Sequence, residues 1–218
     1  MVRTTTASMD SPPFDRLRAT LDLLRSRDTQ ALRSALERQL ASDGLTAFVE
    51  GTLADLVFEV GEAWRRGDIQ VFEEHFFSET VRGVLEAATA PRAVPAGARR
   101  AVLTTLPGEL HTLGLAMVHA LFADAGVECI VLGAQTPLRD VVEAVRAYDA
   151  GLVGLSFSVE YPAELISSSV SVLRTMLPPA TEIWLGGAGA GRATGLPSGV
   201  RVFDSAANAT RALLQAAR

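Results

Sequence analysis

The stretch RAVLTTLPGELHTLGLAMVHALFADAG, residues 100–126, joins an apolar strand-like run to a helical pattern through a loop that contains His111. A buried strand followed by a helix is the unit from which parallel sheets are built, because the helix covers one face of the strand. Further strand-like runs are CIVLG, LVGLSFS, EIWLGG and VRVFD, and helical runs begin near Leu113, Leu138 and Pro162, with a last one after Asn208. This alternation predicts a flavodoxin/Rossmann-like α/β domain with a five-stranded parallel sheet over residues 101–218.

Apolar residues recur at helical spacing before this domain, in four segments. The segments are FDRLRATLDLLRSR, TQALRSALERQLA, DGLTAFVEGTLADLVFEVGEAWRRGD and DIQVFEEHFFSETVRGVLEAAT. We expect Asp28 and Asp68 to cap the second and fourth helices, and the third to end near Arg66. Four helices joined by short breaks predict an N-terminal four-helix bundle over residues 14–88, which would act as a cap for the α/β domain.

Two segments show neither pattern. Residues 1–13 are mostly polar, and we expect them to form a disordered tail. Residues 89–100, TAPRAVPAGARR, contain two prolines and a glycine and are predicted to be a linker. No apolar run approaches the roughly 18 residues of a membrane-spanning helix, and no cleavable signal is evident, so we expect a cytoplasmic protein without a membrane partner.

Charge and cysteine content restrict the class of protein further. The formal net charge is −5, which makes direct DNA binding unlikely because phosphate contacts need a concentrated basic surface. The single cysteine, Cys129, excludes an internal disulfide and is typical of a reducing compartment.

His111 follows the first strand, at the sheet edge where ligands bind in such folds. Gly108 and Gly114 flank it and allow the backbone to turn sharply. An imidazole here could coordinate a metal through one nitrogen while the other donates to the Glu109 carboxylate. Because no second cluster of metal ligands lies nearby in the sequence, one imidazole suits a metal already held by a macrocycle. Taken alone, a purely structural loop histidine remains the alternative.

The sequence ELHTLG, residues 109–114, resembles the (D/E)-x-H-x-x-G motif of the cobalamin-binding domains of methionine synthase, corrinoid methyl carriers and CarH-type photoreceptors. The resemblance implies that His111 is the lower axial ligand of cobalt, that Glu109 hydrogen-bonds it and that Gly114 completes the motif. Two later elements, LSFS and GGAGA, match the family elements that line the slot for the displaced dimethylbenzimidazole tail. The implied slot residues are Ser156, Ser158, Gly186, Gly187 and Gly189. Ser158 departs from the family pattern, which has leucine there.

The helical region AWRRGDIQVFEEHFFSE resembles the cap bundle of CarH-type photoreceptors, so the resemblance extends over roughly residues 15–215. It implies that Trp64, Glu74 and His75 cover the upper face of cobalamin. Arg65 stands where that family has a second histidine, which leaves His75 as the candidate for an upper axial ligand of cobalt. Without the resemblance, Trp64 would be interpreted as a core aromatic residue and His75 as an exposed helix residue.

These resemblances imply a cobalamin cofactor, whose adenosyl, methyl or hydroxo form stays open. They favour a non-enzymatic sensor, a light-responsive regulator that acts through a protein partner such as a transcription factor, as in stand-alone AerR-like antirepressors. We expect no DNA-binding module before the bundle, and homo-oligomerisation stays open. The alternatives are a corrinoid methyl carrier of a methyltransferase system and a cobalamin storage module.

Overall fold

The computed structural model of the protein describes residues 12–89 and 97–216, and its contacts divide the chain into two compact units between Val84 and Leu85. The predicted tail lies outside the described residues, except that Pro12 and Pro13 already belong to the first helix. Most of the predicted linker also lies outside them. Among the described helices, none is both long and apolar enough to cross a bilayer.

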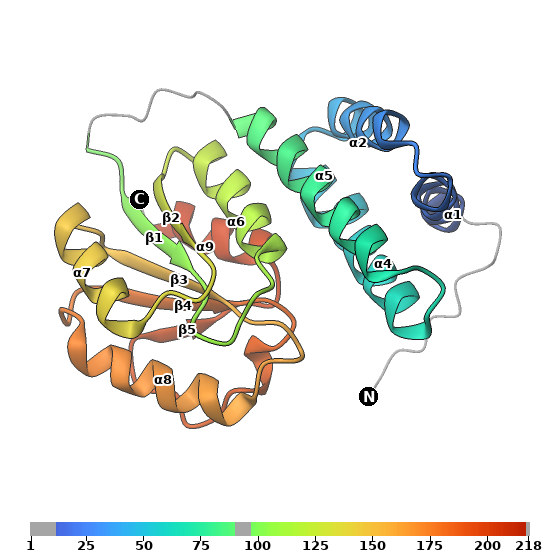
Figure 1. Ribbon diagram of the computed structural model, residues 1–218. Helices are drawn as coiled ribbons and strands as arrows, with labels where there is room; N and C mark the ends of the chain where they lie inside the picture. Colours follow the sequence, from blue (N-terminus) through green and yellow to red (C-terminus); the bar gives the residue numbers. More distant parts are fainter. Residues whose placement is uncertain (1–11, 90–96, 217–218) are drawn as a thin grey trace. The chain divides into compact units, whose positions relative to one another are not determined.

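The second unit is a parallel sheet covered by helices on both faces (Figure 1). Its strands are β1 (Arg100–Thr104), β2 (Glu128–Gly133), β3 (Leu152–Ser156), β4 (Glu182–Gly186) and β5 (Val200–Val202), in the order β2-β1-β3-β4-β5. Its helices are α6 (Leu113–Asp124), α7 (Leu138–Tyr148), α8 (Ala163–Met176) and α9 (Ala206–Ala216), with a short 3₁₀ turn, η2 (Ala190–Arg192). All four strand pairs are parallel, which confirms the predicted flavodoxin-like α/β fold.

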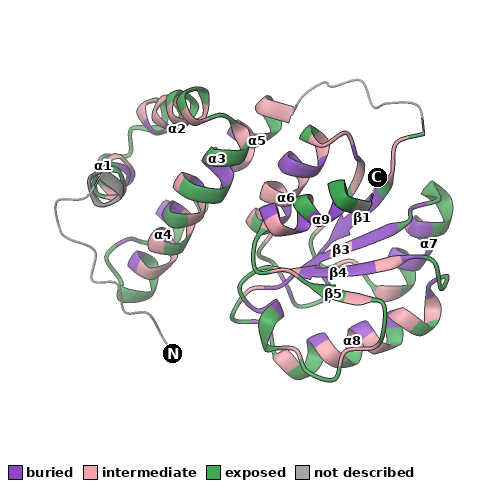
Figure 2. Ribbon diagram, turned by 180° about the vertical axis from the view of Figure 1, so that it is seen from behind, coloured by how far each residue is buried: buried purple, intermediate pink, exposed green. Residues whose placement is uncertain are grey.

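The two faces of the sheet have separate cores, because successive residues of a strand point to opposite faces. On one face Val102, Val153 and Ile183 pack with apolar residues of α7 and α8. On the other face Leu103 and Trp184 pack with residues of α6 and α9. The central strands β1, β3 and β4 are buried along most of their length (Figure 2), as continuous apolar runs predict.

The first unit contains the helical segments expected from the sequence, except that the end of α5 extends past Val84 into the second unit. They are α1 (Pro12–Ser26), α2 (Thr29–Asp43), α3 (Leu45–Ala47), η1 (Phe48–Leu53), α4 (Ala54–Arg66) and α5 (Val71–Thr89). Asp28 caps α2 as predicted, since its carboxylate accepts a hydrogen bond of 2.9 Å from the amide of Ala31. The segment α3–η1–α4 corresponds to the predicted third helix and ends at Arg66 as expected, with left-handed Gly67 after it.

Three local predictions are wrong. Asp68 does not cap α5, because its carboxylate binds the Arg66 guanidinium at 2.8 Å, and α5 begins only at Val71. The Glu73 carboxylate instead accepts from the amide of Gln70 at 2.7 Å, which is half of a capping box. The third helix contains a π-helical segment, η1, that its apolar pattern did not indicate. The last helix begins at Ala206, before the expected start.

The loops after β3 and β4 approach each other so closely that two positions of the β4 loop have no room for a side chain. The amide of Gly189 donates to the carbonyl of Phe157 at 2.9 Å, and that of Phe157 donates to Gly186 at 3.0 Å. A Cβ atom on Gly187 would lie 2.4 Å from the Phe157 carbonyl oxygen, and one on Gly189 would lie 1.9 Å from that of Ser158. Gly187 and Gly189 of GGAGA are therefore required by backbone packing between two loops.

Gly189→Ala is expected to lower the free energy of unfolding by at least about 2 kcal/mol, because one of the two loops must move to admit the methyl group. Urea denaturation of the cofactor-free protein measures the change. Gly191→Ala is the matched control, since a Cβ atom there meets nothing within 4 Å. Equal stability of the two variants would contradict the close approach of the loops.

Candidate functional site

The loop between β1 and α6 carries the histidine of the ELHTLG motif. It turns at Gly108, whose φ of +91° lies in the left-handed region that favours glycine. The Tyr161 hydroxyl donates to the carbonyl of Pro107 at 3.2 Å, and the Thr105 hydroxyl donates to the carbonyl of Glu109 at 2.6 Å. The loop is thus hydrogen-bonded on both sides of its turn, which restricts the position of the residues that follow.

The Glu109 carboxylate is the most completely hydrogen-bonded group of the site, although it is only 1% exposed. Its Oε1 atom accepts from the amide and from Nδ1 of His111 at 2.9 and 2.7 Å. Its Oε2 atom accepts from the amide and the hydroxyl of Ser158 at 2.7 and 2.8 Å. Burial alone would raise the pKa of this carboxyl, but the four donors outweigh it and lower the pKa. Glu109 is therefore an ionised carboxylate at neutral pH.

The hydrogen bond between Glu109 and His111 determines which nitrogen of the imidazole faces Glu109. An ionised carboxylate can only accept hydrogen bonds, so Nδ1 carries a proton, and in the neutral imidazole Nε2 is then the nitrogen with the lone pair. The side chain is 59% exposed, which leaves Nε2 accessible to a ligand. Within residues 12–89 and 97–216, no cluster of three or more His, Cys, Asp or Glu side chains could hold a metal ion. The donor set therefore suits a metal whose other ligands belong to a macrocycle.

Two of the predicted slot residues, Ser156 and Gly186, lie next to each other, and Gly114 of the motif approaches Ser156. A Cβ atom on Gly114, in the first turn of α6, would lie 2.9 Å from the Ser156 hydroxyl at the end of β3. Gly186 is paired with Ser156 in the sheet, and the space where its Cβ would project is open. Gly187 and Gly189 instead pack against the backbone of the β3–α8 loop. Small residues thus surround the carboxyl ends of β3 and β4.

Three predicted site residues lie in the helical unit: Trp64 on α4, and Glu74 and His75 on α5. Nδ1 of His75 lies 2.7 Å from one oxygen of Glu74, and the Ser78 hydroxyl donates to the other oxygen at 2.7 Å. His75 is 72% exposed and Trp64, near the end of α4, is 39% exposed. Trp64 is therefore not a core residue of its unit, and the Glu74–His75 pair repeats the arrangement of Glu109 and His111.

Two residues that hold the histidine loop were not predicted from the sequence, and only part of the role of Ser158 was. Thr105 and Tyr161 bind the loop backbone, and Ser158, predicted only as a slot residue, also binds Glu109. A hydroxyl residue directly after the apolar strand was the available signal for Thr105. No sequence signal pointed to Tyr161, whose hydroxyl acts across 54 positions of the chain.

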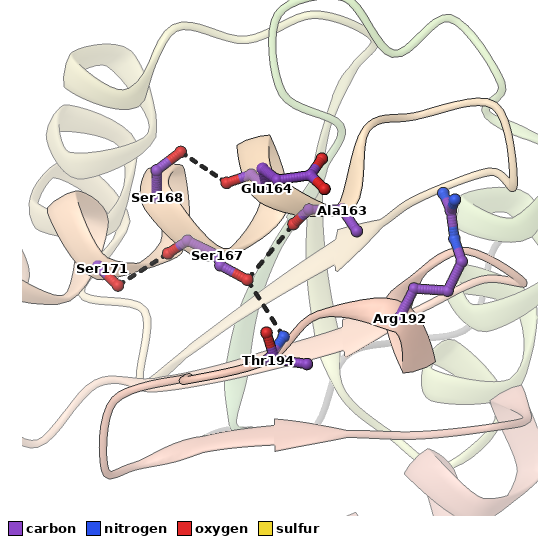
Figure 3. A pocket seen from close by; sticks show the side chains of 7 residues that line it. All are labelled: Ala163, Glu164, Ser167, Ser168, Ser171, Arg192 and Thr194. Atoms are coloured by element: carbon purple, nitrogen blue, oxygen red, sulfur yellow. Dashed lines mark hydrogen bonds between the residues drawn. The ribbon is translucent and has the colours of Figure 1, made fainter.

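A shallow cavity of about 660 Å³ lies along α8 (Figure 3). It is lined by serines of α8 and by Arg192 and Thr194 of the segment after β4. The Ser167 hydroxyl donates to the carbonyl of Ala163 and accepts from the amide of Thr194. No predicted site residue lines this cavity.

Comparison with protein families matches residues 99–214 to the B12 binding domain. The chain belongs to the B12 binding domain family. Residues 17–89 match a second model, also described as a B12 binding domain, so both units are covered. Membership of this family makes the protein a cobalamin-binding protein and confirms the family that the ELHTLG motif indicated.

Individual relatives are of two kinds. The chain is 34% identical over 188 residues to the HTH-type transcriptional repressor CarH of Myxococcus xanthus, covering 84% of this chain but 62% of the repressor. It is 26% identical over 174 residues to the dimethylamine corrinoid protein of Methanosarcina barkeri, covering 77% of this chain and 80% of that protein. The structure of the monomethylamine corrinoid protein of Methanosarcina barkeri superposes with a TM-score of 0.67 at 16% identity, covering 93% and 98% of the two chains, which supports the fold.

Ser158→Ala is expected to lower the free energy of unfolding of the cofactor-free protein by about 1 to 2 kcal/mol, because a buried carboxylate loses one of its donors. Chemical denaturation measures the effect. Ser168→Ala is the control, since that exposed hydroxyl donates to the carbonyls of Glu164 and Leu165 in its own helix. A Ser158 variant as stable as this control would show that the hydroxyl does not stabilise Glu109.

Proposed function

We propose that the protein is a cobalamin-dependent sensor, a light-responsive regulator that acts through a protein partner. The single observation that carries the proposal is the orientation of His111, whose Nδ1 is held by buried Glu109 while Nε2 stays accessible. In this proposal Nε2 of His111 would be the protein's ligand to the cobalt of cobalamin. When bound, cobalamin would supply a cobalt–carbon bond that light can break.

The residues around His111 have distinct tasks in this proposal. Glu109 keeps the proton on Nδ1 and increases the electron density of the imidazole, as a carboxylate behind a metal-bound histidine does. Ser158 shares the negative charge of Glu109 through two donors, so the carboxylate does not need water. Gly114, Ser156 and Gly186 leave room for the flat tail of the cofactor, and Gly187 and Gly189 shape the wall of that slot.

The upper face of cobalamin is assigned to Trp64, Glu74 and His75. The exposed indole of Trp64 would cover the upper ligand of cobalt, and loss of that ligand would remove its support. His75 is the candidate for a replacement ligand, because Glu74 orders its Nδ1 and the ring is largely exposed. Two packings of the helical unit that differ by only a few kcal/mol would let this change act as a switch.

A regulatory role is supported by the similarity to the repressor CarH over 84% of this chain. The chain itself has a net charge of −5, which disfavours contact with DNA phosphates and favours a protein partner such as a transcription factor. We place this activity in the cytoplasm, where the single thiol of Cys129 would stay reduced. The protein would not be a catalyst by itself.

A second candidate is a corrinoid methyl carrier, favoured by the similarity to the dimethylamine corrinoid protein over 77% of this chain. A carrier presents its cofactor to separate methyltransferases, so light should not change its assembly. Remethylation by a methyltransferase, without any response to illumination, would support the carrier over the sensor.

His111→Ala is expected to remove the nitrogen ligand below cobalt and weaken cobalamin binding by about tenfold or more, because no neighbouring imidazole can replace it. Absorption spectra and equilibrium titration with methylcobalamin measure both effects. His119→Ala, which changes the other histidine of the α/β unit, is the control. An unchanged spectrum and affinity in the His111 variant would show that the ligand is assigned wrongly.

Illumination of the protein loaded with adenosylcobalamin in the dark is expected to change its elution volume in gel filtration or its binding to a partner. Trp64→Ala should reduce the difference between dark and light states, because the upper ligand then no longer supports the helix. Phe58→Ala, at another exposed aromatic residue of α4, is the control. A Trp64 variant that responds as fully as the control would contradict the upper-face assignment.

A further inference from the structure

Gln135 has a backbone conformation that its place in the chain does not explain. In the part of the chain that the structure describes, three residues other than glycine have a positive φ: Arg27, Gln135 and Asp149, at 57°, 59° and 49°. Arg27 directly follows α1 and Asp149 ends α7, and a left-handed residue is the ordinary way to end a helix. Gln135 lies in the loop between β2 and α7 and ends no helix. Unfavourable backbone of this kind persists only where surrounding contacts maintain it.

The contacts of Gln135 are with the histidine loop. Its amide donates to the Thr105 hydroxyl at 3.0 Å, and that hydroxyl donates to the carbonyl of Glu109 at 2.6 Å. Its side-chain oxygen, Oε1, accepts from the amide of Gly108 at 3.3 Å. Gly108 is the turning residue of the loop and lies three positions before His111. Both the backbone and the side chain of Gln135 therefore act on the segment that carries the histidine.

We propose that Gln135 is a positioning residue for His111. Gln135 holds the β1–α6 loop from the β2 side, while Ser158 holds Glu109 from the β3 side. This inference rests on the proposed role of His111 as cobalt ligand and adds a residue to which the family resemblance gave no role.

The side chain, and not only the backbone, is required in this account. A glycine would adopt φ of +59° without strain and would keep the amide contact to Thr105, but it would leave the Gly108 amide without the Oε1 acceptor. The turn would then sample more conformations before cobalamin binds, and binding would have to order it. Glutamine at this position thus costs some backbone strain, but it restricts the conformations of the histidine loop.

The test compares Gln135→Gly with Gln135→Glu, which keeps an Oε acceptor of equal reach. Asp149→Gly is the matched control, because it relieves the same backbone strain at the end of α7, outside the histidine loop. Three measurements are made: hydrogen exchange of the Gly108 amide and thermal unfolding in the cofactor-free protein, and equilibrium binding of hydroxocobalamin. The EPR spectrum of the bound Co(II) form adds a direct signature, since an axial imidazole nitrogen splits the cobalt lines into triplets.

Gln135→Gly is expected to speed exchange at Gly108 by about three- to tenfold and to raise the dissociation constant of cobalamin by a similar factor, as loss of one hydrogen bond implies. Its unfolding temperature should not fall below that of the unchanged protein, because strain is relieved. The nitrogen triplets should weaken. Gln135→Glu should restore exchange, affinity and triplets, and Asp149→Gly should leave all three unchanged.

The inference is overturned if Gln135→Gly binds cobalamin with unchanged affinity and full triplets, or if Asp149→Gly loses affinity to the same extent. Failure of the proposed function gives a different result with cobinamide, which lacks the benzimidazole nitrogen: triplets absent from the unchanged protein, or retained in His111→Ala. The exchange rate of Gly108 and the affinity of the Gln135 variants still decide in that case whether Gln135 positions the loop.

Discussion

A buried negative charge, the Glu109 carboxylate, is the constraint on which the candidate site depends. At 1% exposure it cannot be solvated by water, so the protein must supply donors, and four of them come from His111 and Ser158. Satisfying this charge fixes three features at once: the tautomer of the histidine, the conformation of its loop and the distance between the loops after β1 and β3. Removal of the charge would therefore disturb the site more than removal of any single donor.

The order of the strands makes this arrangement possible. Because β1 lies between β2 and β3, the loop that carries His111 has a neighbouring loop on each side at the carboxyl edge of the sheet. Ser158 and Tyr161 contact it from the β3 side, and Gln135 contacts it from the β2 side. The glycines after β4 in turn pack against the backbone that presents Ser158. The position of His111 thus depends on contacts among several loops, all of which follow strands of the same sheet.

The helical unit uses a simpler version of the same chemistry. Glu74 orders His75 through one oxygen and accepts from Ser78 through the other, but all of these contacts lie within one helix and His75 is largely exposed. An exposed pair of this kind can change partners at lower cost than the buried Glu109 group. In the proposed function this difference corresponds to a permanent ligand in the α/β unit and a replaceable one in the helical unit.

Local features of the sequence were enough to predict the elements and the centre of the site. Apolar runs and helical spacing indicate which segments are buried, and the Asp28 cap and the Glu109–His111 contact span three and two positions, so each could be predicted before the fold was known. Ser158 and Gln135 contact the histidine loop across 49 and 27 positions. Those contacts depend on which strands become neighbours in the sheet. The π-helical segment and the absence of an Asp68 cap depend on the packing around them. Local periodicity contains no information about strand order or about this packing.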